Sequence, residues 1–96
     1  MLFAILCNDK PGSLQLRMDT RPEHLTHLNG LGDRLKLAGP FLNAEDKPCG
    51  SLVVVDVADE AEAIAVAEAD PYAKAGLFAD VTVRRWNWTM KNPDAA

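Results

Sequence analysis

The stretch Asp70-Pro71-Tyr72-Ala73-Lys74-Ala75-Gly76-Leu77 decides how the second half of this chain folds. Proline has no amide hydrogen to donate and disfavours a helical residue before it, so a helix ends at or just before Asp70. The alanine-rich residues 60–69 form that helix, and Asp59 and Glu62 have the spacing of a capping box at its start. The stretch therefore places one carboxylate at a defined position between a helix and the segment that follows.

The first half of the chain contains a strand, a loop and a helix. Residues 2–8 are a continuous apolar run followed by turn-forming residues, which predicts a first strand. Residues 9–19 are polar and are predicted as a loop. The stretch Thr20-Arg21-Pro22-Glu23 combines capping-box spacing with a proline in the first turn, which predicts a helix over residues 21–36.

Three more strands are predicted. Residues 37–42 are apolar but contain Gly39-Pro40, so this strand is expected to be bent and near an edge of the sheet. After a polar loop over residues 43–50, the β-branched residues 51–57 predict a third strand. Residues 79–88, in which apolar and polar side chains alternate, predict the fourth.

The resulting order is βαββαβ, which predicts an α+β, ferredoxin-like fold with a four-stranded antiparallel sheet and two helices on one face. Ninety-six residues suffice for one domain, so we assign residues 1–96 to a single domain. Residues 92–96 are predicted to form a loose tail.

Apolar residues occupy both faces of the predicted strands. A sheet covered on one side alternates apolar and polar residues, but in residues 2–8 and 51–57 both parities are largely apolar. Because two helices cover only one face, the other face needs a partner, and the simplest partner is a second copy packed sheet on sheet. The sequence therefore predicts a homodimer. The alternative is that these are scattered exposed apolar residues.

Charge and cysteine content narrow the possible partners and the compartment. The formal net charge is −4 and the pI is near 5.0, whereas a nucleic-acid surface needs clustered basic residues. No apolar run approaches the roughly 18–20 residues of a membrane span, and the N-terminus has no basic leader. Cys7 and Cys49 have no metal or redox spacing, which is typical of free thiols. We therefore expect a cytoplasmic protein with no nucleic-acid or membrane partner.

His24 and Asp70 are the candidate chemical pair. In the predicted helix His24 projects near the centre of a leucine stripe, so it points inward, and we hypothesise that it meets Asp70 at one pocket. Alone, His24 could be a hydrogen-bonded core histidine, and Asp70 could be a turn former. His27 is expected on the flank of the stripe, in contact with solvent. The His24–His27 spacing could serve a metal, but no third ligand is evident, so no metal is predicted.

Four short pieces in this order carry a resemblance: Arg21-Pro22-Glu23-His24-Leu25, Ala38-Gly39-Pro40, Gly50-Ser51 and Asp70–Leu77. Together they resemble the YciI-like (YCII-related) family, from residue 1 to about 86. The resemblance implies a ferredoxin-like fold assembled as a dimeric α/β barrel. It also implies that His24 and Asp70 correspond to the His and Asp proposed as the family's active-site pair. One related branch includes chloromuconolactone dehalogenases, which is a precedent for lactone or elimination chemistry.

In an enzyme, each candidate residue has a distinct role. His24 would be the general acid/base acting on a small organic acid or lactone, and Asp70 would orient its imidazole. The predicted substrate-binding residues are Ser51, as a hydrogen-bond donor, Arg21, as a partner for a carboxylate, the Gly39-Pro40 turn, and Tyr72. Ser51 could instead be structural and Arg21 solvated. No phosphate-binding loop or nucleophile elbow is present, and no cofactor is predicted.

Three functions remain open at this point. The first is a small cofactor-free enzyme of lyase, isomerase or dehalogenase type. The second is a non-catalytic module that binds a small metabolite. The third is an accessory dimer without a ligand.

Overall fold

Four strands form one antiparallel sheet in the computed structural model, which describes residues 1–94. They are β1 (Leu2–Asp9), β2 (Leu35–Leu42), β3 (Pro48–Asp56) and β4 (Phe78–Arg85). Their order in the sheet is β2-β3-β1-β4, so β2 lies at an edge as its proline predicts. Met1 extends the β1 end of the sheet, because its amino group donates to Asp56 Oδ1 at 2.8 Å.

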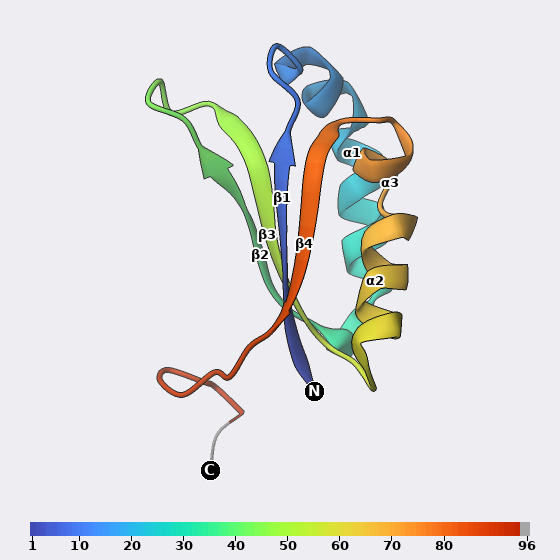
Figure 1. Ribbon diagram of the computed structural model, residues 1–96, viewed down its shortest axis with the longest axis vertical. Coiled ribbons are helices and arrows are strands. Elements are labelled where there is room, and N and C mark those ends of the chain that lie inside the picture. The colour runs from blue at the N-terminus through green and yellow to red at the C-terminus, as the bar shows by residue number, and fades with distance from the viewer. Residues whose placement is uncertain (95–96) are drawn as a thin grey trace.

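The helices lie together on one face of this sheet (Figure 1). They are α1 (Leu14–Gly30), α2 (Glu60–Ala69) and the short α3 (Pro71–Lys74), and a 3₁₀ turn, η1 (Gly32–Arg34), leads into β2. The order and topology are those of a ferredoxin-like α+β fold, which confirms the predicted fold class.

The core lies between the helix-facing side of the sheet and the two long helices, with α2 and the C-terminal end of α1 contributing to it. Phe3 and Ile5 on β1 and Val53 and Val55 on β3 are each less than 5% exposed, and the small helix residue Ala63 packs against them. The register pairs Phe3 with Val55 and Ile5 with Val53, so alternate residues of neighbouring strands fill the same layer. Small side chains on α2 allow the helix to approach the sheet closely.

The predicted start of α1 is wrong. The helix begins at Leu14, after the N-cap Ser13, and the stretch predicted as a loop over residues 9–19 contributes its first turns. Pro22 therefore lies inside the helix and not in its first turn. Because proline has no amide hydrogen, the helical hydrogen bond from residue 22 to the Met18 carbonyl is missing. Pro22 and Met18 are both exposed, so solvent can reach this carbonyl. The helix also ends at Gly30, before the predicted residue 36.

The second helix start follows the sequence pattern. Asp59 is the N-cap of α2, and its side chain accepts a hydrogen bond from the Glu62 amide at 2.9 Å. Glu62 in turn accepts from the Ala58 amide at 3.0 Å. The helix ends at Ala69, where the sequence places Asp70-Pro71. The capping pattern at Asp59 thus marks a true helix start. The same pattern at Thr20 does not, because Thr20 lies inside α1.

The strand boundaries differ slightly from the predicted ones. β2 begins earlier, at Leu35, because the helix has already ended, and β4 ends at Arg85 and not at residue 88. The Trp86 amide still donates to the Leu2 carbonyl at 3.1 Å, so the ladder continues one residue past the strand. In the predicted tail, Asp94 accepts from Lys36 Nζ at 3.2 Å; residues 95–96 lie outside the described part of the chain.

Two glycines are required by the backbone around the site. Gly76 has φ +78° and turns the chain from α3 into β4. Gly50 lies in β3, where a Cβ atom would collide with the Cys7 carbonyl oxygen of β1. The close approach of these strands fixes the position of the residue after Gly50, which is Ser51.

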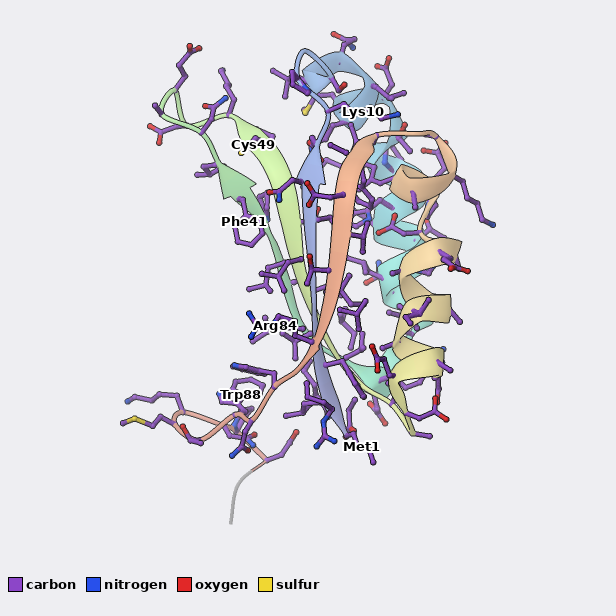
Figure 2. All side chains as sticks on the ribbon, viewed as in Figure 1. Met1, Lys10, Phe41, Cys49, Arg84 and Trp88 are labelled. Atoms are coloured by element: carbon purple, nitrogen blue, oxygen red, sulfur yellow. The ribbon has the colours of Figure 1, made fainter. Side chains whose placement is uncertain are left out.

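The sheet face opposite the helices is largely apolar. It carries alternate strand residues that include Ala4, Leu6, Leu52 and Val54, which line a shallow groove. Figure 2 shows Phe41, Arg84 and Trp88 on this side of the sheet, away from the helices. The homodimer predicted from this pattern stays a prediction.

Candidate active site

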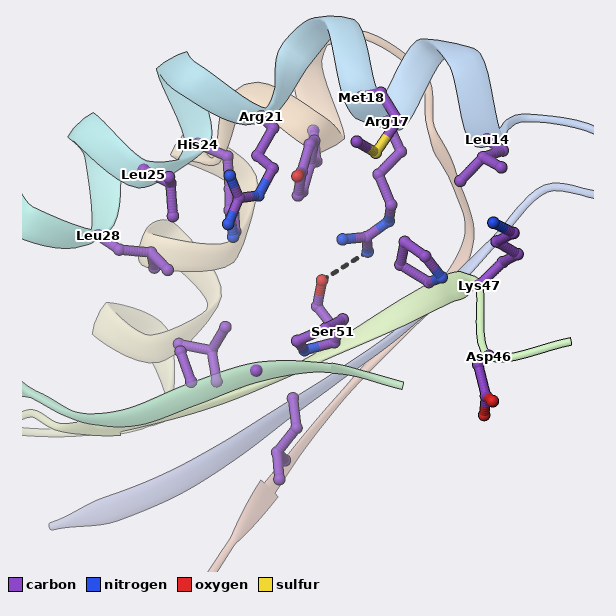
Figure 3. Close-up of a pocket in the computed structure, with 17 residues that line it drawn as sticks. Leu14, Arg17, Met18, Arg21, His24, Leu25, Leu28, Asp46, Lys47 and Ser51 are labelled. Atoms are coloured by element: carbon purple, nitrogen blue, oxygen red, sulfur yellow. Dashed lines mark hydrogen bonds between the residues drawn. The ribbon is translucent and has the colours of Figure 1, made fainter. Parts of the chain in front are cut away.

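A cavity of about 510 Å³ lies between α1 and the β2–β3 half of the sheet (Figure 3). Its helical wall includes Arg17, Arg21, His24 and Leu28, and Tyr72 of α3 closes one side. Its floor comes from residues 38–40 of β2, residues 51–53 of β3 and residues 46–48 at the turn between these strands. The lining is mainly apolar with a few polar groups, which is typical of a small-molecule site.

His24 and Asp70 meet at this cavity within one chain. Nδ1 of His24 lies 2.9 Å from Asp70 Oδ1 and 3.0 Å from Oδ2, and the two residues are 7% and 6% exposed. Because an ionised carboxylate only accepts hydrogen bonds, the Nδ1 atom carries a proton in this pair. With Nδ1 occupied by Asp70, Nε2 is the ring nitrogen of His24 that is left for a ligand in the cavity.

The local sequence after α2 explains how Asp70 reaches His24. Asp70 is the N-cap of α3, and its Oδ1 accepts a hydrogen bond from the Tyr72 amide at 2.9 Å. Pro71 occupies the first helical position, where its missing amide costs nothing. The cap thus fixes the carboxylate while α3 packs against α1. The Asp70 side chain both caps the turn and pairs with His24. Its interpretation as a turn former is therefore compatible with its interpretation as the partner of His24.

Tyr72 packs between two residues of α1. Its ring stacks on His24 with the centroids 4.0 Å apart, and the Arg17 guanidinium carbon lies 4.5 Å from its centroid. Arg17 and His24 are seven residues apart, about 10.5 Å along a helix, so the ring fits between them. Burial, opposed by the positive charge of Arg17, raises the pKa of the Tyr72 phenol. Tyr72 is therefore a neutral hydrogen-bonding group near neutral pH.

A buried ion pair adjoins this stack. Arg17 Nε donates to Asp9 Oδ2 at 2.7 Å and its Nη2 to Asp9 Oδ1 at 3.2 Å. The same Nη2 donates to Ser51 Oγ at 2.7 Å, which Figure 3 shows as a dashed line. Burial disfavours the guanidinium cation, but the hydrogen bond and charge of Asp9 outweigh it and raise the pKa of Arg17. The arginine is held charged and in a fixed orientation.

The other predicted binding residues lie around the cavity with different exposure. Ser51 is buried and bonded to Arg17, whereas Arg21 is exposed at the rim. Gly39 and Pro40 also line the cavity, but they lie within β2 and form no turn, so the predicted turn is wrong. A Cβ atom at Gly39 would meet nothing within 4 Å, so the fold does not require glycine there.

Arg17 and Asp9 were missed by the sequence prediction, because the first turns of α1 were assigned to a loop. The available signal is a spacing. Arg17, Arg21, His24 and Leu28 recur at intervals of four, three and four residues, which places them on one helix face. That face is the one that borders the cavity.

His27 lies apart from the cavity, in a groove between α1 and α2. Its Nε2 is buried and has no hydrogen-bond partner among the described residues, while the residue as a whole is half-buried, so the expectation of a solvated side chain holds only in part. Within residues 1–94 no group of three or more His, Cys, Asp or Glu side chains is arranged to hold a metal ion. The same part of the chain contains no helix long and apolar enough to span a membrane.

Two solved structures show what the fold of this chain is similar to. A solved structure of 5-chloro-2-hydroxyhydroquinone dehydrochlorinase (TftG) from Burkholderia phenoliruptrix, in complex with 2,5-dihydroxybenzoquinone, is 38% identical with a TM-score of 0.85. The match covers 91% of this chain and 94% of TftG. A NIPSNAP family protein from Agrobacterium tumefaciens has a TM-score of 0.59 at 15% identity, over 98% and 97% of the chains, and is similar in fold alone.

Sequence comparison gives the family directly. Protein YciI of Escherichia coli O6:H1 is 38% identical over 92 residues, which is 88% of this chain and 94% of YciI. The profile of the YCII-related domain matches residues 1–87. These matches confirm the resemblance seen in the sequence pieces: this chain belongs to the YCII-related family.

Proposed function

We propose that this protein is a small enzyme that transfers protons and eliminates a leaving group, such as chloride, from a small oxygenated organic compound. The observation that carries the proposal is the buried His24–Asp70 pair, in which Asp70 occupies Nδ1 and His24 lines the cavity. The likeness to TftG, named as a dehydrochlorinase, supports a reaction of dehalogenase type. An organic acid or a lactone is a further substrate class open to the same acid/base pair.

The proposed step is a base-assisted elimination. His24 Nε2 removes a proton from the substrate, the freed electron pair forms a new double bond, and chloride departs with its bonding electrons. The products are the unsaturated compound and HCl, so atoms and electrons balance without an oxidant. Asp70 holds the Nδ1 proton and stabilises the imidazolium that forms. Transfer of the Nε2 proton to solvent then restores the neutral histidine.

The remaining cavity residues would bind and orient the substrate. We propose that Ser51 and Tyr72 give hydrogen bonds to substrate oxygens, and that Arg21 at the rim attracts a negatively charged substrate. Gly39 and Pro40 would form the flat wall opposite α1, where backbone lies close to the ligand.

The test is chloride release from 5-chloro-2-hydroxyhydroquinone by wild type and His24→Ala. An enzyme loses at least about 10²-fold in turnover on loss of its general base, whereas binding of 2,5-dihydroxybenzoquinone, measured by calorimetry, is retained. Binding by both proteins with no turnover by wild type, for this and for related lactones and acids, would favour the metabolite-binding module. Absence of both turnover and binding would favour the accessory dimer.

We also propose that the protein acts as a homodimer, packed through the apolar sheet face that carries Leu6. Leu6→Lys places a charge on this face, and we expect it to shift the mass in solution from dimer to monomer, as measured by light scattering. Ile64→Lys is the matched control, because Ile64 has the same size as leucine and is exposed on α2. A monomeric wild type would contradict the proposal.

A further inference from the structure

Arg17 is a charged side chain that the fold buries and holds at the cavity. It is 4% exposed, and Nε and Nη2 are occupied by Asp9 and Ser51. Burying a charged pair costs free energy that a well-packed apolar pair would not cost. A buried arginine that borders an open cavity is therefore better explained by ligand binding than by a contribution to stability.

Arg17 and Ser51 each keep a hydrogen-bond donor that is available to a ligand. Nη1 of Arg17 makes no hydrogen bond within residues 1–94, and Figure 3 shows that terminal nitrogen pointing into the cavity on the side of His24. Ser51 Oγ accepts from Arg17, which leaves its own hydroxyl hydrogen free to donate. Two donors, one of them charged, thus converge at one end of the cavity.

The charges around the cavity favour an anion. The chain has a net charge of −4, yet Arg17, Arg21 and Lys47 line this cavity and Asp46 is the one acidic residue among its lining residues. The carboxylates of Asp9 and Asp70 do not line it and are bonded to Arg17 and His24. Asp9 neutralises part of the Arg17 charge but holds the guanidinium in place. Because the cavity wall is mostly apolar, the attraction between these cations and an anion is stronger than it would be in water.

We infer that Arg17 and Ser51 form a subsite for an ionised oxygen of the substrate, such as a phenolate, enolate or carboxylate. This inference rests on the proposed function, and it defines the substrate class as a small organic anion. The anionic oxygen would bind on one side of Tyr72 and the proton to be transferred would lie at His24 on the other. The substrate would thus be oriented across the cavity by its charge, with Arg17 as a binding and specificity-determining residue.

The experiment compares two probes by calorimetry. 2,5-Dihydroxybenzoquinone is an acid that is ionised at neutral pH, and hydroquinone is a neutral ring of similar size. Wild type should bind the anion more tightly. The double variant Asp9→Asn with Arg17→Gln removes both buried charges together, and we expect the affinity for the anion to fall at least about tenfold while that for hydroquinone changes little.

A matched control removes a cation from the rim of the same cavity. Lys47→Gln should change the affinity for the anion by less than about fivefold, because Lys47 is exposed. If the double variant binds the anion as wild type does, or if wild type does not prefer the anion, the inference is wrong. Circular dichroism checks the fold. Should the double variant not fold, Arg17→Lys is measured instead, because lysine keeps the charge but lacks the planar fork of arginine. A loss of about fivefold or more in affinity for the anion supports the subsite, and an unchanged affinity overturns it.

The two proposals fail separately. His24→Ala should abolish chloride release while its affinity for the anion stays near that of wild type. If His24→Ala keeps its turnover, the proposed chemistry is wrong and the anion subsite can still stand. If the Arg17 variants keep their affinity, the subsite is wrong and the chemistry can still stand.

Discussion

The two long helices bury different kinds of side chain on the same sheet. The buried residues of α2 are Ala63, Val66 and Ala67, all apolar, whereas α1 buries Arg17 and His24 together with Leu28. The α2 half is filled with core side chains, while the α1 half encloses a cavity and holds its charges in pairs. The α2 half thus buries apolar side chains, whereas the α1 half buries polar and charged side chains beside a cavity.

The largest expected effect lies in the α1 half, at Asp70. Asp70→Asn keeps the size of the side chain, but its amide NH₂ can donate to Nδ1 of His24 and so favour the tautomer that carries its proton on Nε2. That tautomer cannot act as the base, and we expect turnover to fall by about 10³–10⁴-fold. The ¹⁵N chemical shifts of the His24 ring report the tautomer directly. An unchanged tautomer together with full turnover would show that Asp70 serves only as a cap.

Stability should respond most strongly in the α2 half. Ile5→Ala removes a 2%-exposed side chain from the core under α2, and we expect the free energy of unfolding to fall by about 2–5 kcal/mol. Ser51→Ala, the matched change in the α1 half, removes one hydrogen-bond acceptor from Arg17 and should cost about 1 kcal/mol. Urea unfolding measures both. Equal losses would mean that the two halves contribute alike to stability.

The same contrast explains what the sequence could predict. The first strand and the capped, alanine-rich α2 follow local rules, and their predicted bounds agree with the structure to within one residue. The bounds of β3 and β4 are less accurate, because β3 begins at Pro48 and not at residue 51, and β4 ends at Arg85 and not at residue 88. The start of α1 was not, because Thr20 and Glu23 imitate a capping box inside a helix whose true N-cap, Ser13, makes no side-chain cap. That error hid Arg17, because a residue in a loop has no defined face.

The site itself was predictable only in part. His24 and Asp70 each carry a local signal, but their contact depends on α3, a single turn that packs Asp70 against α1. The pairing of Asp9 with Arg17, and of Arg17 with Ser51, joins residues 8 and 34 positions apart. Such contacts depend on how the helix and the strands meet in space, which spacing along the chain does not encode.

A smaller effect compares the two helix starts. Asp59→Ala removes a side chain that caps α2, and we expect a loss of about 0.5–2 kcal/mol in the free energy of unfolding. Ser13→Ala at the start of α1 should cost less, because the Ser13 side chain makes no cap hydrogen bond. Thermal or urea unfolding of the two variants gives the difference. A larger loss at Ser13 would show that the cap forms in solution.

The smallest effect near neutral pH concerns Cys7, which lies where the two halves meet. Burial, aided by the negative charge of Asp70, raises the pKa of its thiol from 9.0 to about 12. Between these values the unfolded chain releases the proton and the folded chain keeps it, so the thiol makes stability fall as pH rises from 9 to 12 and leaves it unchanged below that range. Urea unfolding of wild type and Cys7→Ala at pH 8 and pH 10.5 isolates this contribution, because all other groups titrate in both proteins. The variant should lose less stability than wild type between the two conditions, and parallel losses would mean that folding does not raise the pKa of the thiol.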